Sequence, residues 1–351
     1  MKIHNFSAGP CILPESVLNK ASQAVLDFNG SGLSLIEISH RSKDFVAVME
    51  HAKALVKELL AVPPGYEVLF LQGGASLEFL MATLNFLPEG GKAAYLDTGT
   101  WSSKAIKEAK KFGKVDIVAS SKDKNYNYIP KSFEIPTDAS YLHLTSNNTI
   151  FGTQIKEFPN STVPLICDMS SDIFSKSIDF SNFDLIYAGA QKNMGPAGTT
   201  LVIVKQAALG KTGRDIPSML DYQVHIDKES MFNTPPVFAV YTAMLTLEWL
   251  KDQGGLEAIE KLNAQKAAAL YAEIDNNDKF VGFANKEDRS LMNVTFNLKD
   301  QNNAQAFDEL CLVNGISGIK GHRSVGGYRA SIYNALPLES VEALIKTMRQ
   351  L

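Results

Sequence analysis

Short apolar runs alternate with segments of helical periodicity through the first two-thirds of the chain. Between about residues 67 and 205, runs typical of buried strands are separated by helix-like segments, as where 67–71 is followed by 77–82. This alternation indicates a mainly parallel sheet covered by helices. We therefore predict an α/β fold for this part of the chain.

The last third of the chain has a different pattern. Helical periodicity at 239–250 and 256–274 leads into a smaller α+β part. The elements predicted there are strands at 291–298 and 327–333 and helices at 304–312 and 338–348. We expect a large domain over residues 16–257, and a small domain made of residues 1–15 and 258–351.

One lysine stands on a tight connection between two predicted strands. Lys192 lies between the apolar runs 183–187 and 199–204, in a segment rich in glycine, alanine and proline. Small residues let other groups approach the backbone closely. A desolvated lysine amine is the nucleophile needed for a Schiff base with an aldehyde such as pyridoxal phosphate. Taken alone, the pattern favours an ordinary surface lysine, because lysine is rarely buried.

A carboxylate is predicted at the same edge of the sheet. Asp168 ends the apolar run 163–167 and precedes Lys192 by 24 positions (192 − 168), which leaves room for one further strand. Ligands of parallel sheets bind at the carboxyl ends of the strands, so the two residues are expected to meet there. Such a carboxylate keeps the nitrogen of a pyridine ring protonated. The alternative is a helix or turn cap.

A glycine turn follows the strand predicted at 67–71. Gly73 and Gly74 precede a helix start, an arrangement that directs free backbone N–H groups at an anion, and Ser76 adds a hydroxyl. Many turns of α/β proteins look the same without binding any ligand.

Trp101 occupies a similar position after the strand predicted at 93–97, where it opens a helical stretch. Its flat ring is suited to stacking on a pyridine ring. Packing between helix and sheet is the alternative.

Five motifs are spread over the whole chain. They are NFSAGP (5–10), EISHRS (37–42), YAGAQKNMGPAG (187–198), SMFNTPP (230–236) and KGHRSVGGYRASIYN (320–334). Together they resemble the phosphoserine aminotransferase family, whose members are pyridoxal-phosphate enzymes of the aspartate-aminotransferase fold, fold type I. The resemblance implies that fold for this chain.

The resemblance also implies roles around the cofactor. Lys192 matches the Schiff-base lysine, Asp168 the partner of the pyridine nitrogen and Trp101 the stacking ring. Thr149 matches a hydroxyl near the cofactor ring. The implied phosphate contacts are Ala75, Ser76 and Gln191 from the same subunit, and Asn233 and Thr234 from the neighbouring subunit of a homodimer.

Substrate roles follow from the same motifs. The residues that match contacts to the substrate phosphate are His40, Arg41, His322 and Arg323, whereas Arg329 matches the arginine for the carboxylate. Arginine suits both anions because its planar fork binds two oxygens at once. Some family members carry an arginine where this chain has Ser76, so the division of phosphate binding stays open.

The position of Arg329 in the sequence predicts an anionic partner. It stands in an otherwise strand-like run, and a buried unpaired guanidinium is costly. We expect an anionic partner, either a structural carboxylate or the substrate. The two His-Arg pairs are equally compatible with solvated loop charge.

Composition narrows the class of protein. A net charge of −4 and a pI of about 5.9 give no basic field for nucleic acid. No apolar run approaches the roughly 20 residues of a membrane span, and the first residues lack an apolar signal core. The three scattered cysteines show no metal-ligand spacing and suit a reducing cytoplasm.

The expected function is reversible transamination. Glutamate would give its amino group to 3-phosphohydroxypyruvate, yielding phosphoserine and 2-oxoglutarate in serine synthesis, with a related bacterial route towards pyridoxine. Another enzyme of the same fold, such as a cysteine desulfurase, is an alternative, since fold alone does not fix the reaction. That chemistry needs a cysteine on a mobile loop. A non-enzymatic protein that binds pyridoxal phosphate is the second alternative.

Overall fold

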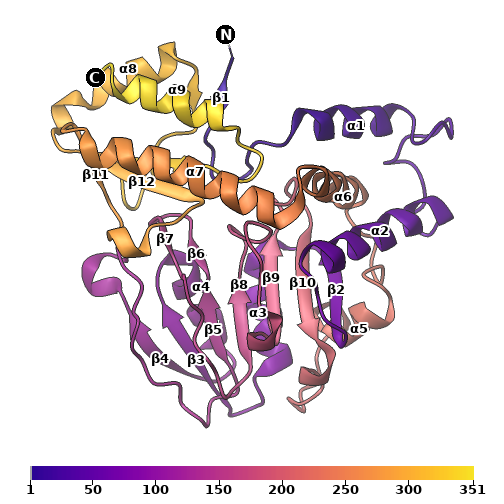
Figure 1. The fold of residues 1–351 in the computed structure, drawn as a ribbon. Helices are drawn as coiled ribbons and strands as arrows, with labels where there is room; N and C mark the ends of the chain where they lie inside the picture. Colours follow the sequence, from indigo (N-terminus) through magenta and orange to yellow (C-terminus); the bar gives the residue numbers. More distant parts are fainter. Residues whose placement is uncertain (1) are drawn as a thin grey trace.

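A seven-stranded mixed sheet forms the centre of the computed structural model, which describes residues 2–351 (Figure 1). The strand order is β2-β10-β9-β8-β5-β3-β4. The strands are β2 (Tyr66–Leu71), β3 (Lys92–Asp97), β4 (Lys114–Ser120), β5 (Leu142–Thr145), β8 (Leu165–Asp168), β9 (Leu185–Gly189) and β10 (Thr200–Lys205). β10 runs antiparallel to β2 and β9, whereas the pairs from β9 to β4 are parallel. The predicted mainly parallel sheet is confirmed.

Helices cover both faces of this sheet, which explains why its inner strands are mostly apolar, whereas the edge strand β4 is partly polar. On one face, α3 (Gly74–Phe86) and α4 (Thr100–Ala109) pack against strand residues such as Tyr187. The helices on the other face are α1 (Glu15–Leu26), α2 (Lys43–Leu59) and α6 (Val237–Asp252). Each large apolar side chain buried in these clusters contributes about 2 kcal/mol relative to an exposed one.

The C-terminal part has its own sheet and core, as the sequence predicts. Its antiparallel strands are β11 (Phe280–Gly282), β12 (Asn293–Leu298) and β14 (Tyr328–Ser331), and its helices are α7 (Gly255–Asn276), α8 (Ala304–Val313) and α9 (Leu338–Met348). Near the N-terminus, β1 (His4–Asn5) pairs in parallel with β13 (Ile316–Ser317), and Phe6 joins the C-terminal core.

The remaining elements are short. They are β6 (Asn147–Asn148), β7 (Thr153–Gln154), α5 (Tyr222–Asp227) and 3₁₀ turns at Lys122–Lys124, Phe180–Asn182, Gln206–Ala208, Ser218–Leu220, Lys286–Asp288 and Gln301–Asn303. Among residues 2–351, no helix is both long and apolar enough to cross a membrane.

Helix α7 runs through the domain boundary predicted at residue 257. Its first turns give Leu256 and Ile259 to the core of the large sheet, whereas Leu270 belongs to the C-terminal core. A continuous helix therefore links the two cores. The division at residue 257 stays a prediction.

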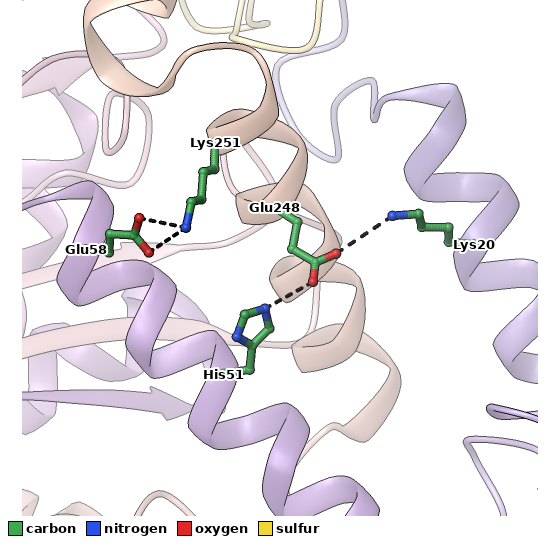
Figure 2. Close-up of polar contacts among 5 residues, drawn as sticks. All are labelled: Lys20, His51, Glu58, Glu248 and Lys251. Atoms are coloured by element: carbon green, nitrogen blue, oxygen red, sulfur yellow. Dashed lines mark hydrogen bonds and ion pairs between the residues drawn. The ribbon is translucent and has the colours of Figure 1, made fainter.

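Ion pairs tie the outer helices of the large sheet to one another (Figure 2). Glu248 of α6 lies 3.1 Å from Nε2 of His51 on α2 and 3.8 Å from Nζ of Lys20 on α1. Glu58 of α2 and Lys251 of α6 approach to 2.7 Å. Pairs exposed to this degree contribute about 1 kcal/mol or less each, so the apolar contacts between these helices dominate.

Candidate active site

Asp168 and Lys192 lie at the carboxyl edge of the large sheet. Asp168 is the last residue of β8, and Lys192 follows β9. Because β8 and β9 are parallel neighbours, both strands end at the same edge of the sheet. Asp168 is buried, and desolvation raises the pKa of its carboxyl while the nearby charge of Lys192 opposes the shift. Its Oδ1 also accepts the backbone N–H of Ser170 at 2.9 Å, so Asp168 caps a turn as well.

The amine of Lys192 is enclosed by protein. Its Nζ donates to Oγ1 of Thr149 at 2.9 Å. Burial lowers its pKa to about 8, an effect that Asp168 opposes and Arg329 strengthens. At that value roughly a tenth of the amine is neutral at pH 7, far more than for an ordinary lysine. The side chain is therefore suited to act as a nucleophile and as a proton carrier.

The connection that carries Lys192 is held from several sides. The N–H of Cys11 donates to the carbonyl of Gln191 at 3.1 Å, and its Sγ donates to the carbonyl of Lys192 at 2.6 Å. Oδ1 of Asn193 accepts the N–H of Asn334 at 2.9 Å. A Cβ on Gly195 would lie 3.0 Å from the backbone of Ala243 in α6, so a small residue is needed there. The N-terminal segment, α6 and the chain after β14 thus fix the position of the lysine.

Trp101 borders the same site. It lies in the first turn of α4, and the centroid of its ring is 5.2 Å from Nζ of Lys192. The ring is half-buried and packs in part against the core under α3 and α4. Its Nε1 is buried without a hydrogen-bond partner among the described residues. The predicted packing between helix and sheet is therefore present, and stacking of the ring on a cofactor stays a prediction.

The glycine turn forms a cradle at the start of α3. Gly73 has φ of +90°, and a Cβ there would lie 2.5 Å from Cβ of Leu77, so glycine is required. α3 begins at Gly74, which puts Ala75 and Ser76 in its first turn, where backbone N–H groups have no acceptor within the helix. The helix start therefore presents free donors to an anion.

The residues expected from a neighbouring subunit lie beside this cradle in their own chain. Nδ2 of Asn233 is 3.5 Å from Oε1 of Gln72, and Nε2 of Gln72 donates to the carbonyl of Thr234 at 2.5 Å. Both Asn233 and Thr234 are exposed. The side chain of Gln191, which precedes Lys192, folds over Gly189 at the end of β9.

Arg329 has no carboxylate partner among residues 2–351. Its Nη1 lies 3.4 Å from the carbonyl oxygen of Thr149, and its Nε is buried without a partner. Burial lowers its pKa. The expected structural carboxylate is therefore absent from the described part of the chain, and an anion from outside is left as the partner of this guanidinium.

His322 and Arg323 lie on the loop before β14, close to Arg329. Burial lowers the pKa of His322, and the charges of Arg329 and Arg323 lower it further. Nδ1 of His322 lies 2.7 Å from Oγ of Ser324. The charges of Arg323 and Arg329 therefore lie near enough to His322 to favour its neutral form.

His40 and Arg41 are not brought into this group by any contact. They lie just before α2, where the N–H of Arg41 donates to Oγ of Ser39 at 3.2 Å. Nε2 of His40 is buried without a partner, and Arg41 is exposed. Among residues 2–351 no hydrogen bond or ion pair joins either residue to the Lys192 group. Their assignment to the substrate stays a prediction.

One cation near the site was not predicted. Nζ of Lys104 lies 4.5 Å from the centroid of the Trp101 ring. The signal was present in the sequence, because a residue three positions after Trp101 on a helix lies on the same face. An exposed lysine on a helix is so common that the spacing alone singled out nothing.

These side chains fit pyridoxal phosphate. The helix start suits a phosphate, Asp168 suits a protonated ring nitrogen, and the orphaned indole and guanidinium face the amine of Lys192. Gly73 and Gly74 have no side chains that could block the cradle.

Comparison with known proteins agrees with this geometry. The model of the class-V aminotransferases matches residues 3–344. Phosphoserine aminotransferase of Flavobacterium psychrophilum is 67% identical over 100% of this chain and 99% of its own, and that of Bacteroides thetaiotaomicron is 59% identical over the same shares.

Solved structures of the same family share the fold of this chain at lower sequence identity. Phosphoserine aminotransferase from Bacillus circulans subsp. alkalophilus has a TM-score of 0.96 at 45% identity, covering 99% of this chain and 98% of that one. A structure of the Trichomonas vaginalis enzyme, described as bound to pyridoxal phosphate, has a TM-score of 0.94 at 37% identity and covers 99% and 100%. The chain therefore belongs to the class-V aminotransferases and, within them, to the phosphoserine aminotransferase family.

Proposed function

We propose that this protein catalyses reversible transamination between glutamate and 3-phosphohydroxypyruvate, giving phosphoserine and 2-oxoglutarate, with pyridoxal phosphate as cofactor. The observation that carries the proposal is the amine of Lys192, which donates to Thr149 and lies near enough to Asp168 and to the unpaired Arg329 for both charges to act on its pKa. Membership of the phosphoserine aminotransferase family supports the choice of substrates.

The chain's own residues would divide the cofactor contacts. When bound, pyridoxal phosphate supplies an aldehyde for amines and a ring that accepts electrons from the substrate carbon. The N–H groups of Ala75 and Ser76 would hold its phosphate, with Gln191 beside them. Asp168 would keep the ring nitrogen protonated, because its buried carboxylate needs a positive partner. Trp101 would lie against the ring, and Thr149 would hold the amine of Lys192 in place.

Lys192 would move the proton in each half-reaction. Its Nζ takes a proton from the substrate carbon and returns it to the cofactor side, and a pKa near 8 suits both directions at neutral pH. Arg329 would bind the carboxylate common to both substrates. The residues proposed for the phosphate are His322, Arg323, His40 and Arg41.

We further propose a cytoplasmic homodimer in which Asn233 and Thr234 reach the partner's cofactor phosphate. Both side chains are exposed at the mouth of the cradle, which makes them available to a second subunit. Serine synthesis is the pathway proposed for the main reaction, with a related phosphorylated substrate in pyridoxine synthesis as a possible second. We also propose that the chain divides into a large and a small domain at residue 257.

The half-reaction with glutamate tests the proposed chemistry. Adding glutamate to the cofactor-loaded protein should convert the absorption of the aldehyde form to that of the amine form. A desulfurase would instead convert cysteine to alanine, and a non-enzymatic binding protein would change neither glutamate nor cysteine. The cysteines argue against desulfuration, because Cys167 and Cys311 are buried and burial raises the pKa of Cys11 to about 12.

A further inference from the structure

Lys104 lies on α4 one turn after Trp101, at the border of the candidate site. Its side chain is exposed, yet its Nζ turns back over the indole ring, 4.5 Å from the ring centroid. Nζ of Lys192 lies 5.2 Å from the centroid of the same ring. The amines of Lys104 and Lys192 therefore both border the indole ring of Trp101.

The charge of Lys104 is felt across the site. Along with burial and the charges of Arg329 and Arg323, it lowers the pKa of His322 on the loop before β14. Lys104 of α4 therefore lies near enough to this loop for its charge to act on His322. Among residues 2–351, no carboxylate forms an ion pair with Lys104, Arg323 or Arg329.

Unneutralised cations that converge in this way repel one another. The arrangement is favourable once an anion of high charge enters, since each cation then gains a partner. A dianionic phosphate meets this need better than a carboxylate does. The cradle offers the substrate no arginine, because Ser76 stands at the position where some family members have one.

We propose that Lys104 is a further substrate-binding residue, which contacts the phosphate of phosphoserine and 3-phosphohydroxypyruvate together with His322 and Arg323. The proposal rests on the function proposed above. An ammonium is suited to the role because its compact charge and three rotatable donors adapt to a tetrahedral phosphate. Lys104 would thereby favour phosphorylated substrates over glutamate, whose distal group is a single carboxylate.

The test compares Lys104→Met with Lys107→Met in the cofactor-loaded protein. Lys107 is an exposed lysine three positions further along α4 that forms no ion pair among the described residues, so it controls for loss of a surface charge. Binding of phosphoserine and of glutamate is followed separately through the cofactor absorption. Inorganic phosphate serves as a competitor that needs no turnover.

Lys104→Met should weaken phosphoserine binding by about tenfold, as for one lost charge-assisted contact. Inhibition by inorganic phosphate should weaken in parallel, glutamate binding should change by less than about threefold, and Lys104→Arg should restore most of the loss. Lys107→Met should resemble the wild type.

Unchanged phosphoserine binding in Lys104→Met would overturn the proposal. Equal losses for both substrates would do the same, since Lys104 would then act through Trp101 and the cofactor. A wild-type protein that reacts with glutamate but not with phosphoserine would instead refute the proposed function.

Discussion

At the scale of single residues, the site depends on charges that the protein itself does not neutralise. Burial lowers the pKa of Lys192 to about 8, and Arg329 is left without a carboxylate in the described part of the chain. Burying the charges of Lys192 and Arg329 lowers the stability of the protein unless bound ligands supply partners for them. In a purely structural network, these groups would form ion pairs with other residues of the protein. Their lack of such pairs among the described residues therefore indicates a functional site.

Lys192 should be the residue that carries the cofactor. Borohydride reduction of the loaded protein should attach the cofactor to the peptide that contains Lys192, and mass spectrometry of the digest checks this. Lys192→Ala should lose that product and nearly all turnover, because Lys192 is the lysine whose charge acts on Asp168. Attachment at Lys205 or Lys211 would show that the assignment is wrong.

The two arginines proposed for the substrate should respond differently. Arg329→Leu should weaken glutamate and phosphoserine alike, by about tenfold or more, because both share the carboxylate that it binds. Arg41→Leu should weaken phosphoserine much more than glutamate. Steady-state kinetics with each substrate measure the difference. Equal losses for both substrates in both variants would remove the basis for dividing the roles.

At the scale of elements, α3 joins the cradle to the segment that leads to Asn233. Glu78 of α3 is fully buried, and its Oε2 accepts the hydroxyl of Tyr222 in α5 at 2.6 Å. Its Oε1 has no partner among the described residues. Asn85, two turns further along α3, accepts the N–H of Tyr222 at 3.2 Å. The helix that presents the cradle thus also positions α5.

Glu78 should make the stability of the protein depend on pH. Burial raises its pKa from 4.5 to about 8, so the folded state holds a proton that the unfolded state releases. The contribution is fully present below the unfolded pKa and is lost as pH rises through 8. Between pH 5 and pH 9 the wild type should therefore lose about 4 kcal/mol of unfolding free energy relative to Glu78→Gln.

Urea unfolding of both proteins, at equal cofactor saturation and several pH values, measures this shift. Glu89→Gln, at an exposed position just after α3, is the matched control and should track the wild type. A constant difference between wild type and Glu78→Gln across this range would show that Glu78 is ionised in the folded protein.

The sequence predicts helices and strands better than it predicts contacts between their side chains. Lys192 and Asp168 could be placed because each follows an apolar strand, and strand ends of a parallel sheet share an edge. The missing partner of Arg329 could not be foreseen, since it depends on which side chains of other elements come near β14. Lys104 escaped notice for the same reason, because its neighbour His322 lies far away in the sequence.

At the scale of the whole molecule, separate parts of the chain converge on one loop. The N-terminal segment through Cys11, and the chain after β14 through Asn334, both bind the connection that carries Lys192. Helix α7 links the core of the large sheet to the C-terminal core. The exposed Asn233 and Thr234 leave one edge of the cradle open to a second subunit.

Shared sites predict that two inactive variants restore each other. Subunits with Lys192→Ala are mixed with subunits in which Asn233 and Thr234 are both alanine, and exchange is allowed. One site of a mixed dimer would then combine an intact lysine with the partner's intact arm, so activity should return. The assay follows phosphoserine formation, with each variant alone as control. Mixed dimers that form without activity would show that the arm serves its own subunit.

The most direct test of the proposed reaction follows the nitrogen atom. Cofactor-loaded protein is incubated with nitrogen-15 glutamate and 3-phosphohydroxypyruvate, and the products are analysed by mass spectrometry. The account predicts labelled phosphoserine and an equal amount of 2-oxoglutarate, with no label transferred by Lys192→Ala. Loss of the glutamate label without labelled phosphoserine, or no transfer at all by the wild-type protein, would contradict it.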